Sequence, residues 1–203
     1  MGLPFLGCTD EASDCFVGSR DEPAQVELVF RTETGQIAPA QEGQSVPLVE
    51  PPQGGQILAI GARARHLNAC GVVLTGSMWD GATALSVERR PVKMVPNGNG
   101  WAEPAHPEEL QNFANIAACP SAAAEKSIHG ERYDVQVNVE DRTGRRAEAR
   151  IGVIPTCSEP AKLDLCTCFC APVTGRSCTL RSDGGTARGD GSQDAGETPQ
   201  ASP

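Results

Sequence analysis

Nine cysteines set the strongest constraint on how this 203-residue chain can fold. Only 4% of the residues are aromatic and 39% are hydrophobic, so the chain can build a core of modest size. Small cores of this kind gain stability from disulfides, which restrict the unfolded chain. An odd number leaves one cysteine over, and the other eight can close four disulfides in a pairing that the sequence leaves open. We therefore expect a domain stapled by disulfides.

The left-over cysteine is Cys8, at the end of the sequence M-G-L-P-F-L-G-C. A short apolar stretch ending in Gly7-Cys8 resembles the end of a bacterial lipoprotein signal, in which the cysteine carries the lipid. The resemblance implies export, with lipid anchoring to the outer membrane or cell surface, or a periplasmic location. The alternative is a free N-terminus whose Cys8 joins a disulfide. With Cys8 as the lipidation site, the disulfide candidates are Cys15, Cys70, Cys119, Cys157, Cys166, Cys168, Cys170 and Cys178.

Acidic and polar segments flank the centre of the chain. Residues 1–24 read as a signal remnant followed by an acidic tether, which covers Thr9–Pro23. At the other end, Ser182–Pro203 is rich in Gly, Ser, Asp and Pro and nearly free of large apolar residues, which predicts a disordered tail. We expect the folded domain at residues 25–157 and a cysteine-rich segment packed against it at residues 158–181.

Three cysteines of that segment follow one another as Cys166-Thr-Cys168-Phe-Cys170. Thiolates bind Cu(I) and Zn(II), so a metal-handling protein of the cell envelope is the alternative function for this chain. The spacing lacks the paired C-x-x-C of structural zinc sites, and in an extended segment Cys168 would face away from the other two. We therefore favour disulfides that pin this segment to the domain, and we assign no metal and no cofactor.

Apolar and polar residues alternate through much of the centre of the chain. The alternation is clearest in Tyr133–Val139 and again in Ala147–Val153, with turn residues at Asp141–Gly144 between them, which predicts a β-hairpin. Weaker runs lie at residues 25–31, 56–65 (with one apolar side), 70–77 and 83–95 (interrupted by Pro91), and a short helical turn is expected at residues 107–113. Short strands separated by turn residues predict an all-β fold, an antiparallel β-sandwich.

The pattern Y-x-V-x-V-x-V-x-D-x-x-G in Tyr133–Val153 resembles the last two strands of an immunoglobulin-like domain. The resemblance extends over residues 25–157 and implies that Tyr133 occupies the tyrosine-corner position at the start of the penultimate strand. The chain departs from the family's pattern in one respect. Neither Trp79 nor Trp101 is flanked by the cysteines of the usual inter-sheet disulfide, so the topology can also be that of a related sandwich.

The net charge and the absence of catalytic motifs limit the classes of function that this chain can have. The net charge of −9 disfavours nucleic acid as a partner, because phosphate binding needs an excess of Lys and Arg. The sequence contains no P-loop, H-E-x-x-H or G-x-S-x-G motif, so we expect a non-enzymatic protein. We predict a cell-envelope lipoprotein with a binding or structural domain, whose membrane contact is its lipid anchor and whose partner is an envelope protein or a glycan. The binding candidates are Trp79, Trp101, Arg145 and Arg146.

Overall fold

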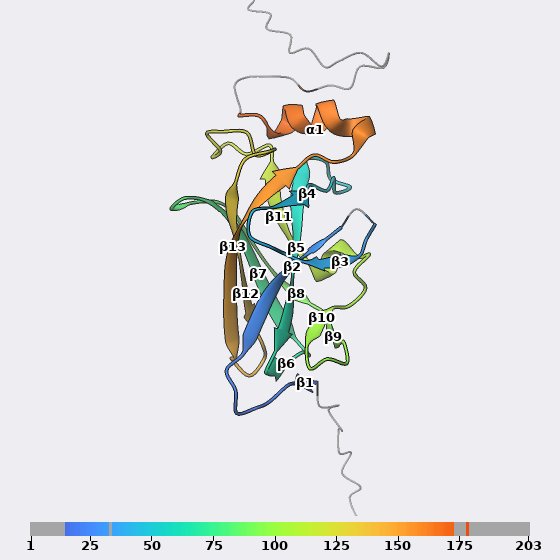
Figure 1. Ribbon diagram of the computed structural model, residues 1–203, viewed down its shortest axis with the longest axis vertical. Helices are drawn as coiled ribbons and strands as arrows, with labels where there is room; N and C mark the ends of the chain where they lie inside the picture. The colour runs from blue at the N-terminus through green and yellow to red at the C-terminus, as the bar shows by residue number, and fades with distance from the viewer. Residues whose placement is uncertain (1–14, 33, 173–177, 179–203) are drawn as a thin grey trace, which may run out of the picture.

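The computed structural model describes residues 15–32, 34–172 and 178, in which two large β-sheets pack face to face (Figure 1). The predicted disulfide-stapled antiparallel β-sandwich is confirmed. One pair of strands, β4 and β13, runs parallel. Cys8 and the predicted disordered tail at Ser182–Pro203 lie outside the described residues.

Each sheet is built from strands that are distant in the sequence. The first sheet has the order β3-β2-β5-β10-β9, with β11 also paired to β5. Its strands are β2 (Gln25–Arg31), β3 (Ile37–Pro39), β5 (Gln56–Arg65), β9 (Met94–Pro96), β10 (Ala102–Pro104) and β11 (Ala114–Cys119). The second sheet has the order β4-β13-β12-β7-β8. Its strands are β4 (Gln44–Pro47), β7 (Val72–Asp80), β8 (Thr83–Val92), β12 (Tyr133–Glu140) and β13 (Arg146–Thr156).

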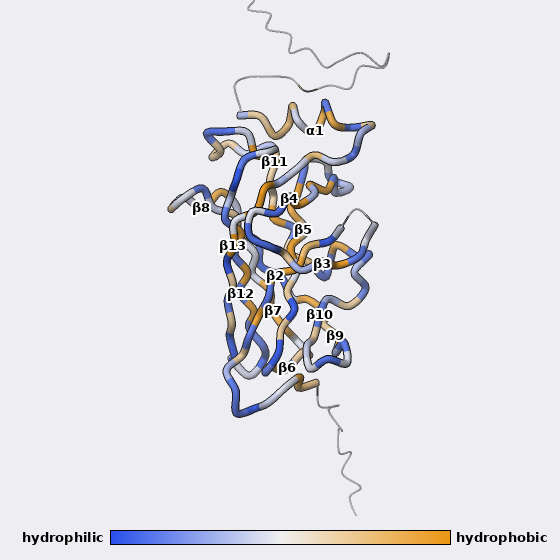
Figure 2. Tube along the Cα trace, in the orientation of Figure 1, coloured by the Kyte–Doolittle hydropathy of each residue, from blue (hydrophilic) through white to orange (hydrophobic). Residues whose placement is uncertain are grey.

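Alternation decides which side chains enter the core. Along β12 every second residue from Tyr133 to Val139 is buried, as the sequence predicts, and Figure 2 shows hydrophobic and hydrophilic residues alternating along β12 and β13. The sheets pack tightly at Gly76 of β7, where a Cβ atom would lie 2.5 Å from the Cβ atom of Ala114 in β11. A larger residue at position 76 would therefore force the two sheets apart.

Two sequence predictions about strands need correction. Strand β5 was expected to bury one side, yet both of its faces are buried, because Phe113 and Pro104 cover Gly61 on the outer face. Strand β8 continues through Pro91 to Val92 without the expected interruption. A proline is tolerated there because β8 is the edge of its sheet, where a missing N–H group breaks no ladder. The helical turn expected at residues 107–113 is present as the 3-10 helix η1 (Leu110–Asn112).

One end of the sandwich, which we call the cap end, is closed by a helix that two disulfides attach to the strands. After η2 (Pro160–Lys162), the helix α1 (Leu163–Cys170) lies across this end (Figure 1). Cys166 bonds to Cys157 just after β13, and Cys170 bonds to Cys119 at the end of β11. The segment is helical where the sequence analysis treated it as extended. Cys168 nevertheless faces away from Cys166 and Cys170, as expected. Residues four apart share one face of a helix, whereas Cys168 lies on another face and bonds to Cys178.

The opposite end, which we call the latch end, is closed by the N-terminal segment. Residues 15–23 were predicted to belong to a tether, but they pack on the domain. Strand β1 (Phe16–Val17) pairs with β6 (Leu67–Asn68), and Cys15 bonds to Cys70. No helix in the described part of the chain is long and apolar enough to cross a membrane.

Candidate functional site

The outer face of the second sheet carries rows of polar side chains. The strand register places Glu148, Asn138, Thr75 and Arg89 side by side, from β13 through β12 and β7 to β8. Because neighbouring strands lie about 4.8 Å apart, the row spans about 15 Å. These residues take outward positions in their strands, since the intervening residues supply the core. The alternation that builds the core therefore also builds this polar face.

A hollow of about 520 Å³, which we call the face hollow, lies over this row. Arg146 and Glu140 form an ion pair of 2.8 Å at its rim. Arg89 lies exposed at the opposite side, and within the described residues it has no ion pair. The hollow therefore offers one unpaired guanidinium beside hydroxyl, amide and carboxylate groups. Its full lining is Val73, Thr75, Arg89, Asn138, Val139, Glu140, Arg146, Ala147 and Glu148.

A second hollow of about 410 Å³, which we call the seam hollow, opens where the edges of the two sheets face each other. Strand β13 pairs with β4 only from Val153 to Thr156, and β2 pairs with β3 only from Val29 to Arg31. The remaining parts of β13 and β2 leave an open seam between the sheets. The seam hollow is lined by Ala24, Gln25, Val26, Glu27, Arg65, Trp101, Ala147 and Glu148.

Ala147 and Glu148 line both hollows, so the two hollows adjoin at β13, and we refer to them together as the groove. Glu148 is exposed and accepts a hydrogen bond of 3.4 Å from the Gln136 amide. A carboxylate at the junction can accept hydrogen bonds from a ligand that occupies either hollow.

Trp101 forms one wall of the seam hollow and is held by arginines. The Arg65 guanidinium lies 4.6 Å from the centre of the Trp101 ring, and that of Arg63 lies 5.5 Å away. Arg65 also donates from Nε and Nη2 to the Gln25 side-chain oxygen, at 2.8 and 2.6 Å. Cation–π contact and hydrogen bonds together fix the positions of this ring and this guanidinium before any ligand binds.

The structure brings only some of the four predicted binding residues together. Arg146 borders the face hollow and Trp101 the seam hollow, so these two lie on the same groove. Trp79 lies farther along the outer face, beside Asp134, where its Nε1 donates to the Ser77 hydroxyl at 2.8 Å and Arg150 lies over its ring. Trp79 therefore lies on the same sheet face but outside the lining of either hollow.

The fourth predicted residue, Arg145, lies at the latch end, and its guanidinium is already engaged. It donates to the carbonyl oxygens of Glu22 at 2.8 Å and His66 at 2.7 Å, and also to that of Arg20. These bonds fasten the N-terminal segment to the turn between β12 and β13. The geometry gives Arg145 a structural role at the latch end.

Sequence reasoning missed most of the groove. Glu148, Asn138, Thr75, Arg89 and Arg65 were not singled out. The signal for the first three was present, because each is a polar residue at an outward position of an alternating strand. Which strands lie side by side was not visible in the sequence, since β7 pairs with β12 across more than fifty residues.

Side chains that could bind a metal ion lie close together in two places within the described residues. One is a group of cysteines, and the other is a histidine with two glutamates. The sulfur atoms of Cys157, Cys166 and Cys170 lie within 4.8 Å of one another at the cap end. The Cys166-Cys168-Cys170 set considered from the sequence does not converge, because Cys168 bonds to Cys178. The second group, His106, Glu108 and Glu109, is in the loop after β10, where His106 and Glu108 are exposed and pair at 3.4 Å.

Comparison with known proteins gives no relative from which a role could be transferred. Protein-family models give no match to this chain, and curated proteins give none either. The groove must therefore be interpreted from its own chemistry.

Proposed function

We propose that this chain is an exported, lipid-anchored, non-enzymatic binding domain that holds a glycan of the cell envelope in the groove formed by the face hollow and the seam hollow. The observation that carries the proposal is the junction at Ala147 and Glu148, two residues that line both hollows. Sugars present hydroxyl groups and weakly apolar C–H faces. Both can be satisfied by amide, carboxylate and guanidinium groups beside small apolar residues.

The surface chemistry favours a glycan over a protein partner. Stable protein interfaces rely on large apolar or aromatic anchors buried in pockets. Among the described residues, the large hydrophobic side chains that are exposed are Val87, Val95 and Leu163, and they lie on three different elements. They form no shared patch. A partner that hydrogen bonds along a polar groove fits this surface better.

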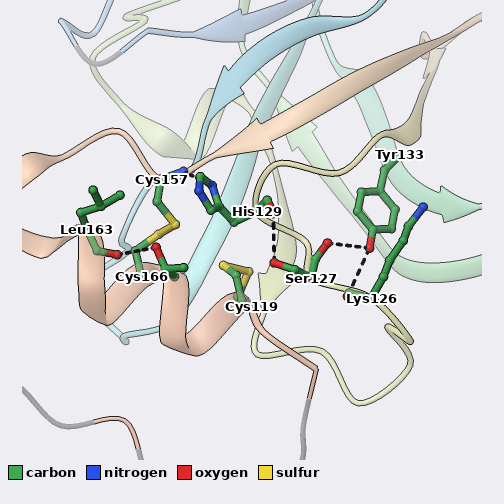
Figure 3. Close-up of a disulfide and its surroundings, with 10 residues drawn as sticks. Cys119, Lys126, Ser127, His129, Tyr133, Cys157, Leu163 and Cys166 are labelled. Carbon is green, nitrogen blue, oxygen red and sulfur yellow. Dashed lines mark hydrogen bonds between the residues drawn. A yellow bond between two sulfur atoms is a disulfide. The ribbon is translucent and has the colours of Figure 1, made fainter. Parts of the chain in front are cut away.

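Within this proposal the domain is immunoglobulin-like. The order β13-β12-β7-β8 matches the G-F-C-C′ order of a variable-type domain. The Tyr133 hydroxyl donates to the carbonyl oxygens of Lys126 and Ser127, at 3.4 and 3.2 Å, which is the contact of a tyrosine corner (Figure 3). Neither β5 nor β12 contains a cysteine, so the usual disulfide between the sheets is replaced by bridges at the two ends.

The lipid anchor at Cys8 would orient the domain. Cys15, which is disulfide-bonded to the latch end, follows Cys8 by seven positions in the sequence. A chain of that length spans at most about 24 Å, so the latch end would face the membrane and the cap end would point away from it. Four disulfides support this compartment, because such bonds persist in oxidising surroundings outside the cytosol.

A glycan array with a matched pair of variants tests the binding proposal. The folded domain is applied to immobilised neutral and uronic-acid oligosaccharides. Glu148→Ala removes the carboxylate at the junction, and Glu159→Ala removes an exposed carboxylate at the cap end. We expect Glu148→Ala to weaken binding at least tenfold with an unchanged melting temperature, and Glu159→Ala to bind like the wild type. Equal binding by both variants, or retention of envelope proteins and no glycan, would refute the proposal.

Metabolic labelling tests the anchor. The full-length precursor is produced in a bacterium with lipoprotein processing and grown with labelled palmitate. Label on the wild type and none on Cys8→Ser is expected. Label on neither protein would remove the anchor from the proposal and leave the groove unaffected.

A further inference from the structure

Four cysteines from distant parts of the chain meet at the cap end. Cys157, Cys166 and Cys170 have their sulfur atoms within 4.8 Å of one another, and Cys119 is bonded directly to Cys170. All four residues are buried. Figure 3 shows the Cys157–Cys166 bridge next to the sulfur atoms at Cys119, on the side of α1 that faces the sandwich. Two buried disulfides thus lie next to each other.

Three structural elements position these sulfur atoms. Cys119 ends β11, Cys157 follows β13, and α1 supplies both Cys166 and Cys170 from one face. The strands are fixed by their sheets, and the helix spacing of four residues brings its two sulfur atoms to the same side. The cluster therefore joins α1 to one strand of each sheet.

We propose that the sulfur atoms of Cys119, Cys157, Cys166 and Cys170 form a latent zinc site, which is filled by one Zn²⁺ when the two disulfides are reduced. Zinc binds four thiolates tetrahedrally at about 2.3 Å, which places the sulfur atoms about 3.8 Å apart. Three of these sulfur atoms, on Cys157, Cys166 and Cys170, already lie within 4.8 Å of one another, and the fourth, on Cys119, is bonded to the sulfur atom of Cys170. The same four residues can then close the cap end either with two disulfides or with one metal ion.

The chemistry balances with a dithiol reductant. Each disulfide accepts two electrons and two protons from one dithiol, which becomes a cyclic disulfide, and two cysteine thiols are released. Binding of Zn²⁺ by the four thiols then releases up to four protons. No further oxidant or co-reactant is needed.

The imidazole of His129 contacts the segment that carries Cys157, and the group of metal-ligating atoms at the cap end contains sulfur atoms and no histidine nitrogen. His129 Nδ1 accepts a hydrogen bond of 3.0 Å from the backbone N–H of Cys157 (Figure 3). That bond holds the ring against the segment that carries Cys157. We assign His129 to positioning of this segment, and the four thiolates to the metal.

Anaerobic titration of the full chain with Co²⁺, after reduction with a phosphine, tests the proposal. Tetrahedral thiolate sites give intense sulfur-to-cobalt charge-transfer bands, so Co²⁺ reports both stoichiometry and ligand type. We expect one Co²⁺ per chain, displaced by Zn²⁺, with the intensity of four thiolates. Cys157→Ser should weaken Co²⁺ affinity at least tenfold. The matched control Cys168→Ser/Cys178→Ser removes the neighbouring bridge, which lies outside the cluster, and should bind Co²⁺ like the wild type.

Circular dichroism during the same titration keeps the result interpretable if the reduced chain loses structure. Recovery of the β-sheet signal on addition of Zn²⁺ in the wild type and the control, and its absence in Cys157→Ser, would support the site. An absence of charge-transfer bands at equimolar Co²⁺ would overturn it, as would equal binding by Cys157→Ser and the wild type.

Discussion

The two ends of this sandwich are closed by different chemistry. At the cap end, two adjacent disulfides join α1 to the ends of β11 and β13. At the latch end a single disulfide, Cys15–Cys70, is supported by polar bonds to main-chain groups. The cap is therefore held mainly by covalent links, whereas the latch is held by one link and a network. A cross-link alone can fix a helix on a sandwich, but a strand segment with an extended backbone also needs its polar groups satisfied.

The latch network centres on three side chains. Buried Asp141 accepts a hydrogen bond from the Asn68 backbone N–H at 2.8 Å, while Arg145 binds carbonyl oxygens of the N-terminal segment. His66 Nδ1 accepts from the Ser19 N–H at 2.8 Å, and its Nε2 lies 3.0 Å from the Glu22 carboxylate. The latch should thus keep its local structure when its disulfide is removed, and the cap should not.

The largest expected effect comes from removing the long-range bridges. Cys119 and Cys170 are 51 residues apart, and Cys15 and Cys70 are 55 apart. The chain-entropy model assigns each bridge about 4 kcal/mol of unfolding free energy. Cys119→Ser/Cys170→Ser and Cys15→Ser/Cys70→Ser should each lose about that much in urea unfolding.

Hydrogen exchange then compares the amide protection of the two ends in these variants. Amides of β1 should remain protected in Cys15→Ser/Cys70→Ser, because Arg145 and the pairing with β6 remain. Amides of α1 should exchange freely in Cys119→Ser/Cys170→Ser. Equal loss of protection at both ends would remove the contrast between cap and latch.

Asp141 is expected to have the next largest effect. Asp141→Ala leaves the buried Asn68 N–H without an acceptor and removes the bonds to Thr143 and Arg145, which should lower the unfolding free energy by about 3 kcal/mol. Asp134→Ala, which removes an exposed ion pair with Arg150, should lower it by less than about 1 kcal/mol. Chemical unfolding at neutral pH compares the two variants.

The Asp141 effect should also depend on pH. Burial acts to raise the pKa of Asp141, but the hydrogen bonds from Asn68, Thr143 and Arg145 outweigh it and hold the pKa below its usual value. A lowered pKa in the folded state stabilises the protein above the unfolded pKa of about 4, and this contribution is lost as pH falls through the folded value. The difference in stability between wild type and Asp141→Ala should therefore shrink below about pH 4. A constant difference across that range would contradict the assigned hydrogen bonds.

Arg145 and Arg146 are adjacent in the sequence but have different roles, so their alanine variants form a matched pair. Arg145→Ala removes charged donors from main-chain carbonyl oxygens and should lower the unfolding free energy by about 2 kcal/mol. Arg146→Ala removes an exposed ion pair with Glu140 and should change it by less than about 1 kcal/mol. Thermal and urea unfolding would distinguish them, and a larger loss for Arg146→Ala would reverse the assignment.

A smaller stability effect than at Arg145 is expected at Tyr133. Tyr133→Phe removes the hydroxyl bonds to Lys126 and Ser127 and should lower the unfolding free energy by about 1 kcal/mol. Burial raises the pKa of Tyr133 to about 12, with smaller contributions from the Asp80 and Glu131 carboxylates. A raised folded pKa means that this contribution is complete below the unfolded pKa of about 10 and is lost as pH rises through about 12. Wild type should therefore lose stability in that alkaline range faster than Tyr133→Phe.

Local patterns in the sequence predicted much of the fold but little of the groove. The alternation in Tyr133–Val139 predicted β12 and its buried face, because a strand's side chains alternate whatever its neighbours are. The burial of both faces of β5 depends on Phe113, which is distant in the sequence, and no local pattern reports such a contact. The groove depends in the same way on which edges meet, since Trp101 and Glu148 approach one another only through the seam between the sheets.

The central proposal is that the disulfides of this chain form outside the cytosol. The most direct test is the intact mass of the protein isolated from its native envelope, measured after thiol alkylation, with and without prior reduction. The account predicts no alkylation before reduction, eight alkylated cysteines after it, corresponding to the four disulfides, and a lipid mass on Cys8. A protein recovered from the cytosol with all nine cysteines alkylated before reduction would contradict it.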